Sequence, residues 1–92
     1  MRYELEFSKS AKEDIKRHLK ANDRQILKKL YVLLDEIKDH PETGTGEPEQ
    51  LKSYKGIRWS RRITGKHRLV YDIFKENVIV NVVQAWGHYD DK

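Results

Sequence analysis

Basic residues concentrate in one short stretch of the sequence, from Ile57 to Arg68, which contains no Asp or Glu. A guanidinium offers two parallel N–H donors that match two phosphate oxygens, so clustered arginines suit a polyanionic partner such as nucleic acid. The alternatives are a solvated strand face and pairing with carboxylates such as Asp72. The basic members of the stretch are Arg58, Arg61, Arg62, Lys66 and Arg68, with His67 among them.

The last apolar run, VIVNVVQAW, ends at Gly87 and is followed at once by His88 and Tyr89. An unperturbed histidine has a pKa of about 6.5 and can exchange a proton near neutral pH, while an aromatic ring can stack on a base. The pair is therefore a candidate for chemistry at the end of a strand; the alternative is a frayed terminus with an ordinary surface histidine. His67 could compete for the acid role but ranks second, because its alternation places it toward the core.

Metal and thiol chemistry have little support in the sequence. The absence of cysteine excludes a disulfide, a thiol nucleophile and a Cys-based zinc site. His88, Asp90 and Asp91 offer metal-ligand types, but three residues on a flexible end make a poorly organised site. His18 and His40 have no supporting neighbours. We therefore expect neither a metal nor a cofactor.

The chain has 92 residues, a net charge of +4 and a pI near 9.3. A chain of this length builds one core and buries about 60–65% of its unfolded surface, so we expect a single domain over residues 1–92. No run approaches the ~20 apolar residues of a membrane span, and no apolar segment follows Met1. We therefore expect a cytoplasmic protein without a membrane partner, with a flexible tail at residues 90–92.

The elements that must position these groups begin with a strand and a helix. The opening string RYELEF alternates charged and apolar residues, which indicates a half-buried strand. Ser8 or Ser10 can cap the helix that follows, and Ser10 and Glu13 have capping-box spacing. The side of this helix that we expect to be buried has residues at helical intervals: Ala11, Ile15, His18 and Leu19.

A second helix is predicted after a cap at Asn22 or Asp23. Its apolar residues form one broad stripe, which is typical of a helix that packs on a core. The stripe consists of Ile26, Leu27, Leu30, Leu33, Leu34 and Ile37, and the charged side opposite includes Arg24, Lys28, Lys29 and Glu36.

The prolines and glycines from Pro41 to Pro48 end the helical pattern and predict a loop of about fifteen residues. Three strands are then predicted at residues 57–63, 67–74 and 78–86, joined by short turns into an antiparallel meander. The order of elements predicts an α+β fold in which both helices cover one face of a small sheet.

Alternation decides which side chains point away from the helices. In HRLVYDIF it places Arg68 on the open face and the more apolar set toward the helices. In the preceding strand Arg61 is the odd member of the apolar face, and Arg58 and Arg62 lie on the open face. We therefore expect two or three arginines to share the open face. The set facing the helices is His67, Leu69, Tyr71 and Ile73.

Four strings occur in an order and spacing that resembles the YoeB branch of the RelE-type bacterial toxins: GTGEPEQLK, WSRRIT, HRLVY and a terminal HY. The resemblance extends from the second helix to Tyr89. Members of that family are ribosome-dependent messenger-RNA endonucleases held inactive by a cognate antitoxin. The resemblance implies the toxin of a type II toxin–antitoxin system, with a RelE-like fold of the microbial RNase type and a sheet that is antiparallel apart from the N-terminal strand.

The resemblance also implies site residues. The glutamate of the family falls on Glu49, its arginine on Arg68 and its terminal pair on His88 and Tyr89. The proline that usually follows the glutamate is Gln50 here, and residues 90–92 extend past the tyrosine. Together with the basic block, the predicted RNA-binding set is Lys52, Arg58, Arg61, Arg62 and Lys66.

RNA carries its own nucleophile, the 2′-hydroxyl, so cleavage without a metal needs a base, an acid and a cation for the charged intermediate. The resemblance implies Glu49 as the base, His88 as the acid and Arg68 as the charge stabiliser, with Tyr89 placing the substrate. The expected products are a 2′,3′-cyclic phosphate and a 5′-hydroxyl, and DNA should resist cleavage. Two alternatives remain open: a non-catalytic toxin of the same fold that inhibits a protein target such as gyrase, and a general RNA-binding domain.

The expected partners are the ribosome with its messenger RNA and a YefM-like antitoxin, and a homodimer is compatible with the sequence. The open arginine face suits an acidic peptide or an amphipathic helix of the antitoxin.

Overall fold

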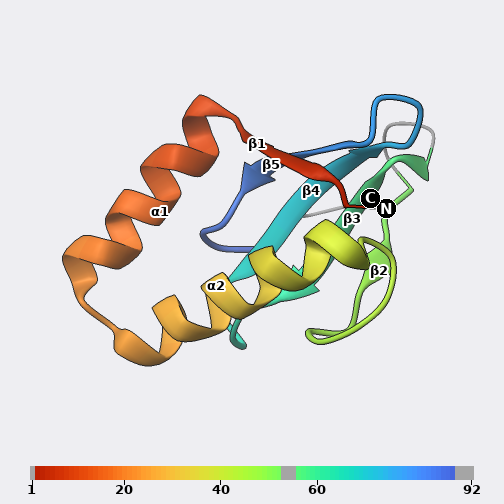
Figure 1. The fold of residues 1–92 in the computed structure, drawn as a ribbon. Coiled ribbons are helices and arrows are strands. Elements are labelled where there is room, and N and C mark those ends of the chain that lie inside the picture. The colour runs from red at the N-terminus through yellow and green to blue at the C-terminus, as the bar shows by residue number, and fades with distance from the viewer. Residues whose placement is uncertain (1, 53–55, 89–92) are drawn as a thin grey trace.

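The computed structural model describes residues 2–52 and 56–88, in which two helices cover one face of a five-stranded sheet (Figure 1). This arrangement confirms the predicted α+β fold. No helix in the described ranges is long and apolar enough to span a bilayer. In chain order the elements are β1 (Glu4–Phe7), α1 (Lys9–Ala21), α2 (Arg24–Asp39), β2 (Glu49–Gln50), β3 (Arg58–Arg62), β4 (Arg68–Phe74) and β5 (Ile79–Gln84).

The strands lie in the order β1-β5-β4-β3-β2. β1 runs parallel to β5, whereas all other neighbours are antiparallel, so β3, β4 and β5 form the predicted meander. The last strand therefore lies inside the sheet, between the first strand and β4. The chain that leaves β5 emerges beside the start of β4, which is where the basic block ends.

Both helices begin at side-chain caps. Ser8 caps α1 by accepting the N–H of Ala11 at 3.1 Å, so the alternative cap at Ser10 is wrong. Asp23 caps α2, and Asn22 instead ends α1 in a left-handed conformation with φ of 53°. Each cap satisfies N–H groups that have no partner within the helix.

The core lies between the helices and the sheet. α2 supplies the predicted apolar stripe except Leu27, which is not among the core residues, and β4 supplies its predicted helix-facing set. In α1, Ala11 and His18 are buried, but Leu19 is 49% exposed and stays outside the core. The buried cluster comprises Ala11, Leu30, Leu33, Leu34, Ile37, Ile63, Leu69, Tyr71, Ile73, Val80, Val82 and Ala85.

The long loop after α2 is shorter than predicted, because it contains the strand β2. Glu49 and Gln50 pair with Ser60 and Trp59 of β3 and extend the sheet by one strand. The side chain of Gln50 also donates to the carbonyl of Gly56 at 2.7 Å. Gln50, where the family resemblance expects a proline, is therefore held in the sheet beside Glu49.

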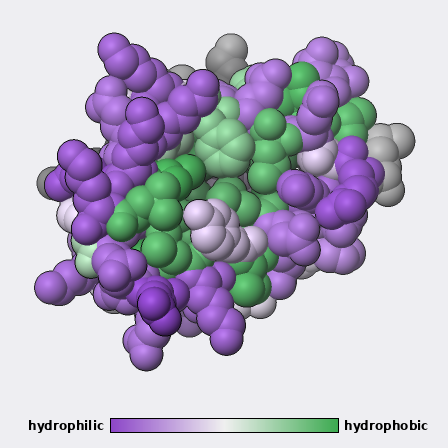
Figure 2. Space-filling model, turned by 60° about the vertical axis from the view of Figure 1, so that its left-hand side comes forward, coloured by the Kyte–Doolittle hydropathy of each residue, from purple (hydrophilic) through white to green (hydrophobic). Residues whose placement is uncertain are grey.

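An apolar surface remains exposed where the two helices diverge, and charged side chains surround it (Figure 2). Large apolar residues exposed on the helices are Leu19 on α1 and Tyr31 and Val32 on α2. A groove of about 660 Å³ lies between α2 and β1, which is the edge strand of the sheet. Apolar surface with a charged rim is typical of an interaction site.

Candidate active site

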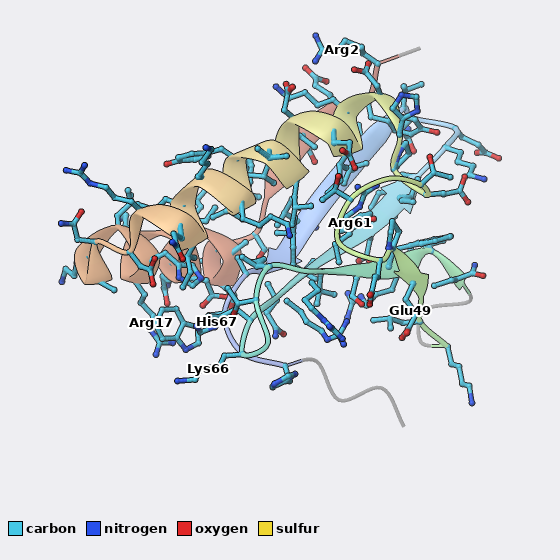
Figure 3. The ribbon with its side chains drawn as sticks, turned by 90° about the horizontal axis from the view of Figure 1, so that it is seen from below. Arg2, Arg17, Glu49, Arg61, Lys66 and His67 are labelled. Atoms are coloured by element: carbon cyan, nitrogen blue, oxygen red, sulfur yellow. The ribbon has the colours of Figure 1, made fainter. Side chains whose placement is uncertain are left out.

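Glu49 lies on the open face of the sheet, the side away from the helices (Figure 3). Its cross-strand partner is Ser60, which faces Val70 in β4, which in turn faces Gln84 in β5. Directly opposed residues of antiparallel strands project to the same face, so these side chains form one row across the sheet. Neighbouring strands are about 4.8 Å apart, which puts the backbone of Glu49 about 10 Å from β4.

Arg62 and Arg68 face each other in the next row, one step from Glu49. Arg62 is exposed and Arg68 is partly exposed. The contact of Arg62 with Glu47, at 3.7 Å between two exposed side chains, is worth at most about 1 kcal/mol. Like charges directly opposed in a sheet are destabilising, so this pair provides a site where a bound anion would relieve repulsion.

Arg58 also lies on the open face but is paired within the protein. Its Nε and Nη2 donate to the two carboxylate oxygens of Asp72 at 2.7 and 2.9 Å. The two side chains are only 10% and 7% exposed. The alternative of pairing with Asp72 is therefore confirmed, and an RNA contact by Arg58 would have to compete with this two-pronged bond.

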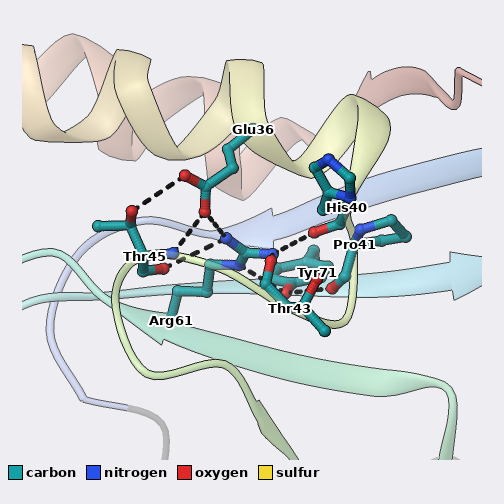
Figure 4. Close-up of polar contacts among 7 residues, drawn as sticks. All are labelled: Glu36, His40, Pro41, Thr43, Thr45, Arg61 and Tyr71. Atoms are coloured by element: carbon teal, nitrogen blue, oxygen red, sulfur yellow. Dashed lines mark hydrogen bonds and ion pairs between the residues drawn. The ribbon is translucent and has the colours of Figure 1, made fainter.

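The prediction that Arg61 contacts RNA is wrong, because its side chain has no exposed surface. It points toward the helices, where Nε donates to the Tyr71 hydroxyl at 3.0 Å and Nη1 donates to Glu36 at 2.6 Å (Figure 4). The guanidinium also donates to three backbone carbonyls of the loop after α2, those of His40, Thr43 and Thr45. Arg61 therefore fastens the loop to α2 and β3.

Glu36 departs from the predicted solvated side of α2 and completes this buried network. One carboxylate oxygen accepts the Arg61 guanidinium, and the other accepts the Thr45 hydroxyl at 2.9 Å. Burial alone would raise the pKa of Glu36, but the hydrogen bonds from Thr45 and Arg61 outweigh it and hold that pKa below 4.5. Gly44 is required here, because it has φ of +120° and a Cβ would lie 1.9 Å from Glu36 Oε1.

The loop from residue 40 to residue 48 is thus anchored from several sides. The Tyr71 hydroxyl donates to the carbonyl of Pro41 at 2.7 Å, and the N–H of Arg62 donates to the carbonyl of Gly46 at 2.7 Å. These bonds lie immediately before β2. They therefore determine where the loop delivers Glu49 to the open face.

His88 follows β5 and is exposed, at the end of the sheet where β4 begins. The N–H of Arg68 donates to the carbonyl of Gly87 at 2.9 Å, which holds the backbone before His88 beside the arginine. Gly87 has φ of +80°, so the chain turns here as predicted. The Gln84 side chain adds bonds to the carbonyls of Trp86 and His88 at 3.1 and 3.3 Å. Sequence reasoning missed Gln84, although it is a polar residue within an apolar run.

His67 is buried against the helices as predicted, and its ring is used internally. Its Nδ1 accepts the N–H of Gly87 at 3.0 Å. Burial lowers the pKa of His67, and the nearby positive groups of His18, Lys66 and Arg17 lower it further. A neutral ring that accepts a backbone N–H suits a structural role better than proton donation to a substrate.

The expectation that His18 has no supporting neighbours is wrong. Its Nε2 donates to the carbonyl of Ala85 at 2.7 Å, and its ring lies 4.8 Å from the His67 ring and 4.6 Å from the Trp86 ring, centroid to centroid. The guanidinium of Arg17 covers Trp86 at 3.9 Å from the ring centre. These partners are far away in the sequence, so local patterning contains no signal for them.

Two further predicted site residues are exposed lysines, and one lies outside the described residues. Lys52 follows β2. Lys66 lies in the turn between β3 and β4 (Figure 3). Tyr89 and the predicted tail at residues 90–92 lie outside the described residues.

A cavity of about 970 Å³ opens between the junction of the helices and the turn that joins β3 to β4. Its walls include Ile26, Lys29, Ile63 and Trp86, but none of the three catalytic candidates that the structure describes, Glu49, Arg68 and His88. Lys66, a predicted RNA-binding residue, lies on its rim. The candidate site is therefore the open face and its edge.

Comparison with known proteins agrees with this fold. The profile of YoeB-like toxins of bacterial type II toxin–antitoxin systems matches residues 7–89. Toxin YoeB of Synechocystis sp. is 41% identical over 68 residues, which are 74% of this chain and 77% of that protein. The YoeB dimer from Staphylococcus aureus superposes with a TM-score of 0.79 and 37% identity, over 97% of this chain and 100% of that one.

A second structure from Staphylococcus aureus, a heterotetrameric YoeB–YefM toxin–antitoxin complex, has a TM-score of 0.77 and 36% identity over 97% of this chain and 100% of the matched one. The profile match extends over most of the sequence and includes every candidate catalytic residue. This chain therefore belongs to the YoeB-like toxin family of bacterial type II toxin–antitoxin systems.

Proposed function

We propose that this toxin is an endoribonuclease that cleaves messenger RNA in the ribosome, by attack of the RNA 2′-hydroxyl on the adjacent phosphate. The observation that carries the proposal is the opposed pair of Arg62 and Arg68, with Glu49 in the neighbouring row. Repulsion between the two cations favours a bound phosphate. A carboxylate beside that phosphate provides the base that the reaction needs.

In the proposed reaction Glu49 takes the proton of the 2′-hydroxyl as its oxygen attacks phosphorus. Arg68 stabilises the additional negative charge on the phosphorane, and Arg62 binds the substrate backbone. His88 protonates the 5′-oxygen as the bond from phosphorus to that oxygen breaks. The products are a 2′,3′-cyclic phosphate and a 5′-hydroxyl, and no metal ion is required. Tyr89 is proposed to stack on a base next to the scissile phosphate.

Dependence on the ribosome is proposed from the family and fits the shape of the site. Glu49 is exposed on the open face of the sheet and His88 is exposed at the end of the sheet, so the toxin alone does not enclose its substrate. A messenger RNA already held by the ribosome would reach this face with much of its positional entropy removed, and correct placement accounts for a large part of many rate enhancements.

A translation extract tests the proposal directly. Added toxin should cut the translated message, with cleavage sites mapped by primer extension. Glu49→Ala should lose at least about 100-fold in rate, within the usual contribution of a general base. The control Glu13→Ala removes an exposed glutamate of α1, on the covered side of the molecule, and should cleave like the wild type.

A second experiment tests whether the RNA 2′-hydroxyl is the nucleophile. A message with a 2′-deoxynucleotide at the mapped site should resist cleavage, because the attacking oxygen is missing. Growth arrest without cleaved RNA ends would instead support the non-catalytic alternative. Equal cleavage by the wild type and Glu49→Ala would exclude Glu49 as the base.

We propose a YefM-like antitoxin as the partner that silences the toxin. The apolar groove between β1 and α2, with exposed Tyr31 on its wall, suits an amphipathic segment, and the open arginine face suits an acidic one. Tyr31→Glu should weaken binding of the antitoxin from the same operon, whereas Lys16→Glu, an exposed change on α1, should leave it unchanged. Wild-type affinity of Tyr31→Glu would exclude the groove. A homodimer, as in the Staphylococcus aureus structure, is also proposed and is tested by light scattering.

A further inference from the structure

Two consecutive residues bind both backbone polar groups of Gly87. The N–H of Arg68 donates to the Gly87 carbonyl at 2.9 Å, and the side chain of His67 accepts the Gly87 N–H at 3.0 Å. His67 and Arg68 come from the start of β4, and Gly87 directly precedes His88. The two bonds hold the two peptide units that flank the Cα of Gly87, and the second of these units leads directly into His88.

The protonation of His67 follows from this geometry. An N–H can only donate, so the Nδ1 that faces Gly87 must carry no proton, and a neutral ring then has its proton on Nε2. The ring is oriented by contacts with His18, edge to face at 4.8 Å, and with Trp86 at 4.5 Å between centroids. Packing on two sides thus fixes the direction in which Nδ1 points.

Packing does not fix Gly87 itself. Apart from its two chain neighbours, no atom of the described residues lies within 4 Å of the position where its Cβ would be, and glycine at φ of +80° has many other conformations available. The peptide between Trp86 and Gly87 is therefore held by its hydrogen bonds, one from the Gln84 side chain to the Trp86 carbonyl and one from the Gly87 N–H to His67. Loss of the bond to His67 would leave this peptide held by Gln84 alone, and the direction of His88 would be less restricted.

We propose that His67 is a positioning residue: its Nδ1 holds the Gly87 amide so that the His88 side chain stays beside Arg68 for proton transfer. This inference rests on the proposed function, in which His88 is the general acid. His67 itself does not touch the substrate. It acts through Gly87, and substrate binding by the open-face arginines does not involve it.

A matched pair of substitutions tests the hydrogen-bond acceptor of His67 separately from its ring contacts. Asn has its side-chain oxygen at the same bond distance from Cα as Nδ1 of histidine, and Leu has the shape of Asn without the oxygen. Both variants lose the ring contacts equally. His67→Leu should lower kcat for message cleavage roughly tenfold to a hundredfold with KM within about twofold, because misplacement of a catalytic group affects the chemical step. His67→Asn should restore kcat to within about threefold of wild type.

Hydrogen exchange of the Gly87 amide, followed by NMR, provides a readout that does not depend on activity. The amide should be protected in the wild type and in His67→Asn, and unprotected in His67→Leu. If His67→Leu folds poorly, His67→Gln takes its place, since its amide is displaced by one bond and no longer offers an acceptor at the Nδ1 position.

Equal kcat in the Asn and Leu variants, or equal protection of Gly87 in both, would overturn the proposal. Failure of the proposed function has a different signature. If the wild type and His88→Gln cleave at the same rate, His88 is not the acid, yet the exchange of Gly87 still decides whether His67 holds this peptide.

Discussion

Arg61 and Arg62 are adjacent in the sequence, yet they belong to two regions with opposite properties. Arg61 lies under α2 with no exposed surface, and its donors are taken up by Glu36, Tyr71 and the carbonyls of the loop after α2. Arg62 lies on the open face, exposed, and opposite a second arginine. One charge is neutralised within the protein, and the other is placed where it repels its neighbour.

The difference shows that a basic block is not a functional unit. In a strand each step reverses the face, so a run of arginines is divided between two environments. On the covered side, the loop and α2 supply enough acceptors to make a buried guanidinium tolerable. On the open side the protein supplies few acceptors to Arg62 and Arg68. These two arginines are therefore the members of the basic block that suit an external phosphate.

The largest expected effect is a difference in stability between variants of the two regions. Arg61→Met should reduce the free energy of unfolding by about 3–5 kcal/mol, because it leaves a carboxylate and several carbonyls without their partner. Arg62→Met should change it by no more than about 0.5 kcal/mol. Urea denaturation of both variants measures the difference. Equal losses would show that the buried network does not carry the stability assigned to it.

The next largest expected effect is a loss of cleavage activity in a variant of the open face. Arg68→Met should lower the rate of message cleavage by about 100- to 1000-fold, the usual result of removing one group that stabilises the charge of the transition state. Its melting temperature should stay at or slightly above the wild-type value, since repulsion with Arg62 is relieved. Cleavage at the wild-type rate would remove Arg68 from the site.

A smaller effect concerns the turn at Gly87 that precedes His88. Gly87→Ala should cost about 1–2 kcal/mol, because alanine at φ of +80° is strained although none of the described residues beyond its chain neighbours would meet the added Cβ. Cleavage should fall together with stability if the turn must rearrange. Thermal unfolding and the translation assay check this in parallel, with Gly65→Ala, an exposed glycine with open space around it, as the control.

The smallest expected effect is a dependence on pH within the buried network. The pKa of Glu36 is lower in the folded protein than its ordinary 4.5, so its contribution to stability is present above about pH 4.5 and is lost as the pH falls through the folded value. Glu36→Gln removes this contribution. The stability gap between wild type and Glu36→Gln should therefore narrow from pH 7 to about pH 3 in denaturation experiments. A gap that stays constant would show that the Glu36 charge is not what Arg61 requires.

Much of the fold and part of the site could be predicted from the sequence. Alternation in β4 predicted that Leu69 and Tyr71 face the helices, and the glycine after β5 predicted the turn before His88. The family resemblance pointed to Glu49 and Arg68. These predictions depend on periodicity, turn chemistry and order along the chain, all of which are local properties.

The sequence by itself therefore determined the two helices, the first strand and the antiparallel meander, and the family, but not the short strand β2. Only the tertiary structure decided which charged residues are used internally. Glu36 meets Arg61 across 25 positions, and His18 meets Ala85 across 67. No local pattern encodes such partners, because a buried polar group is satisfied by whatever acceptors the fold brings to it. The same holds for His67, the second candidate for the acid role. In the folded protein its ring accepts a hydrogen bond from Gly87, directly before His88, the first candidate.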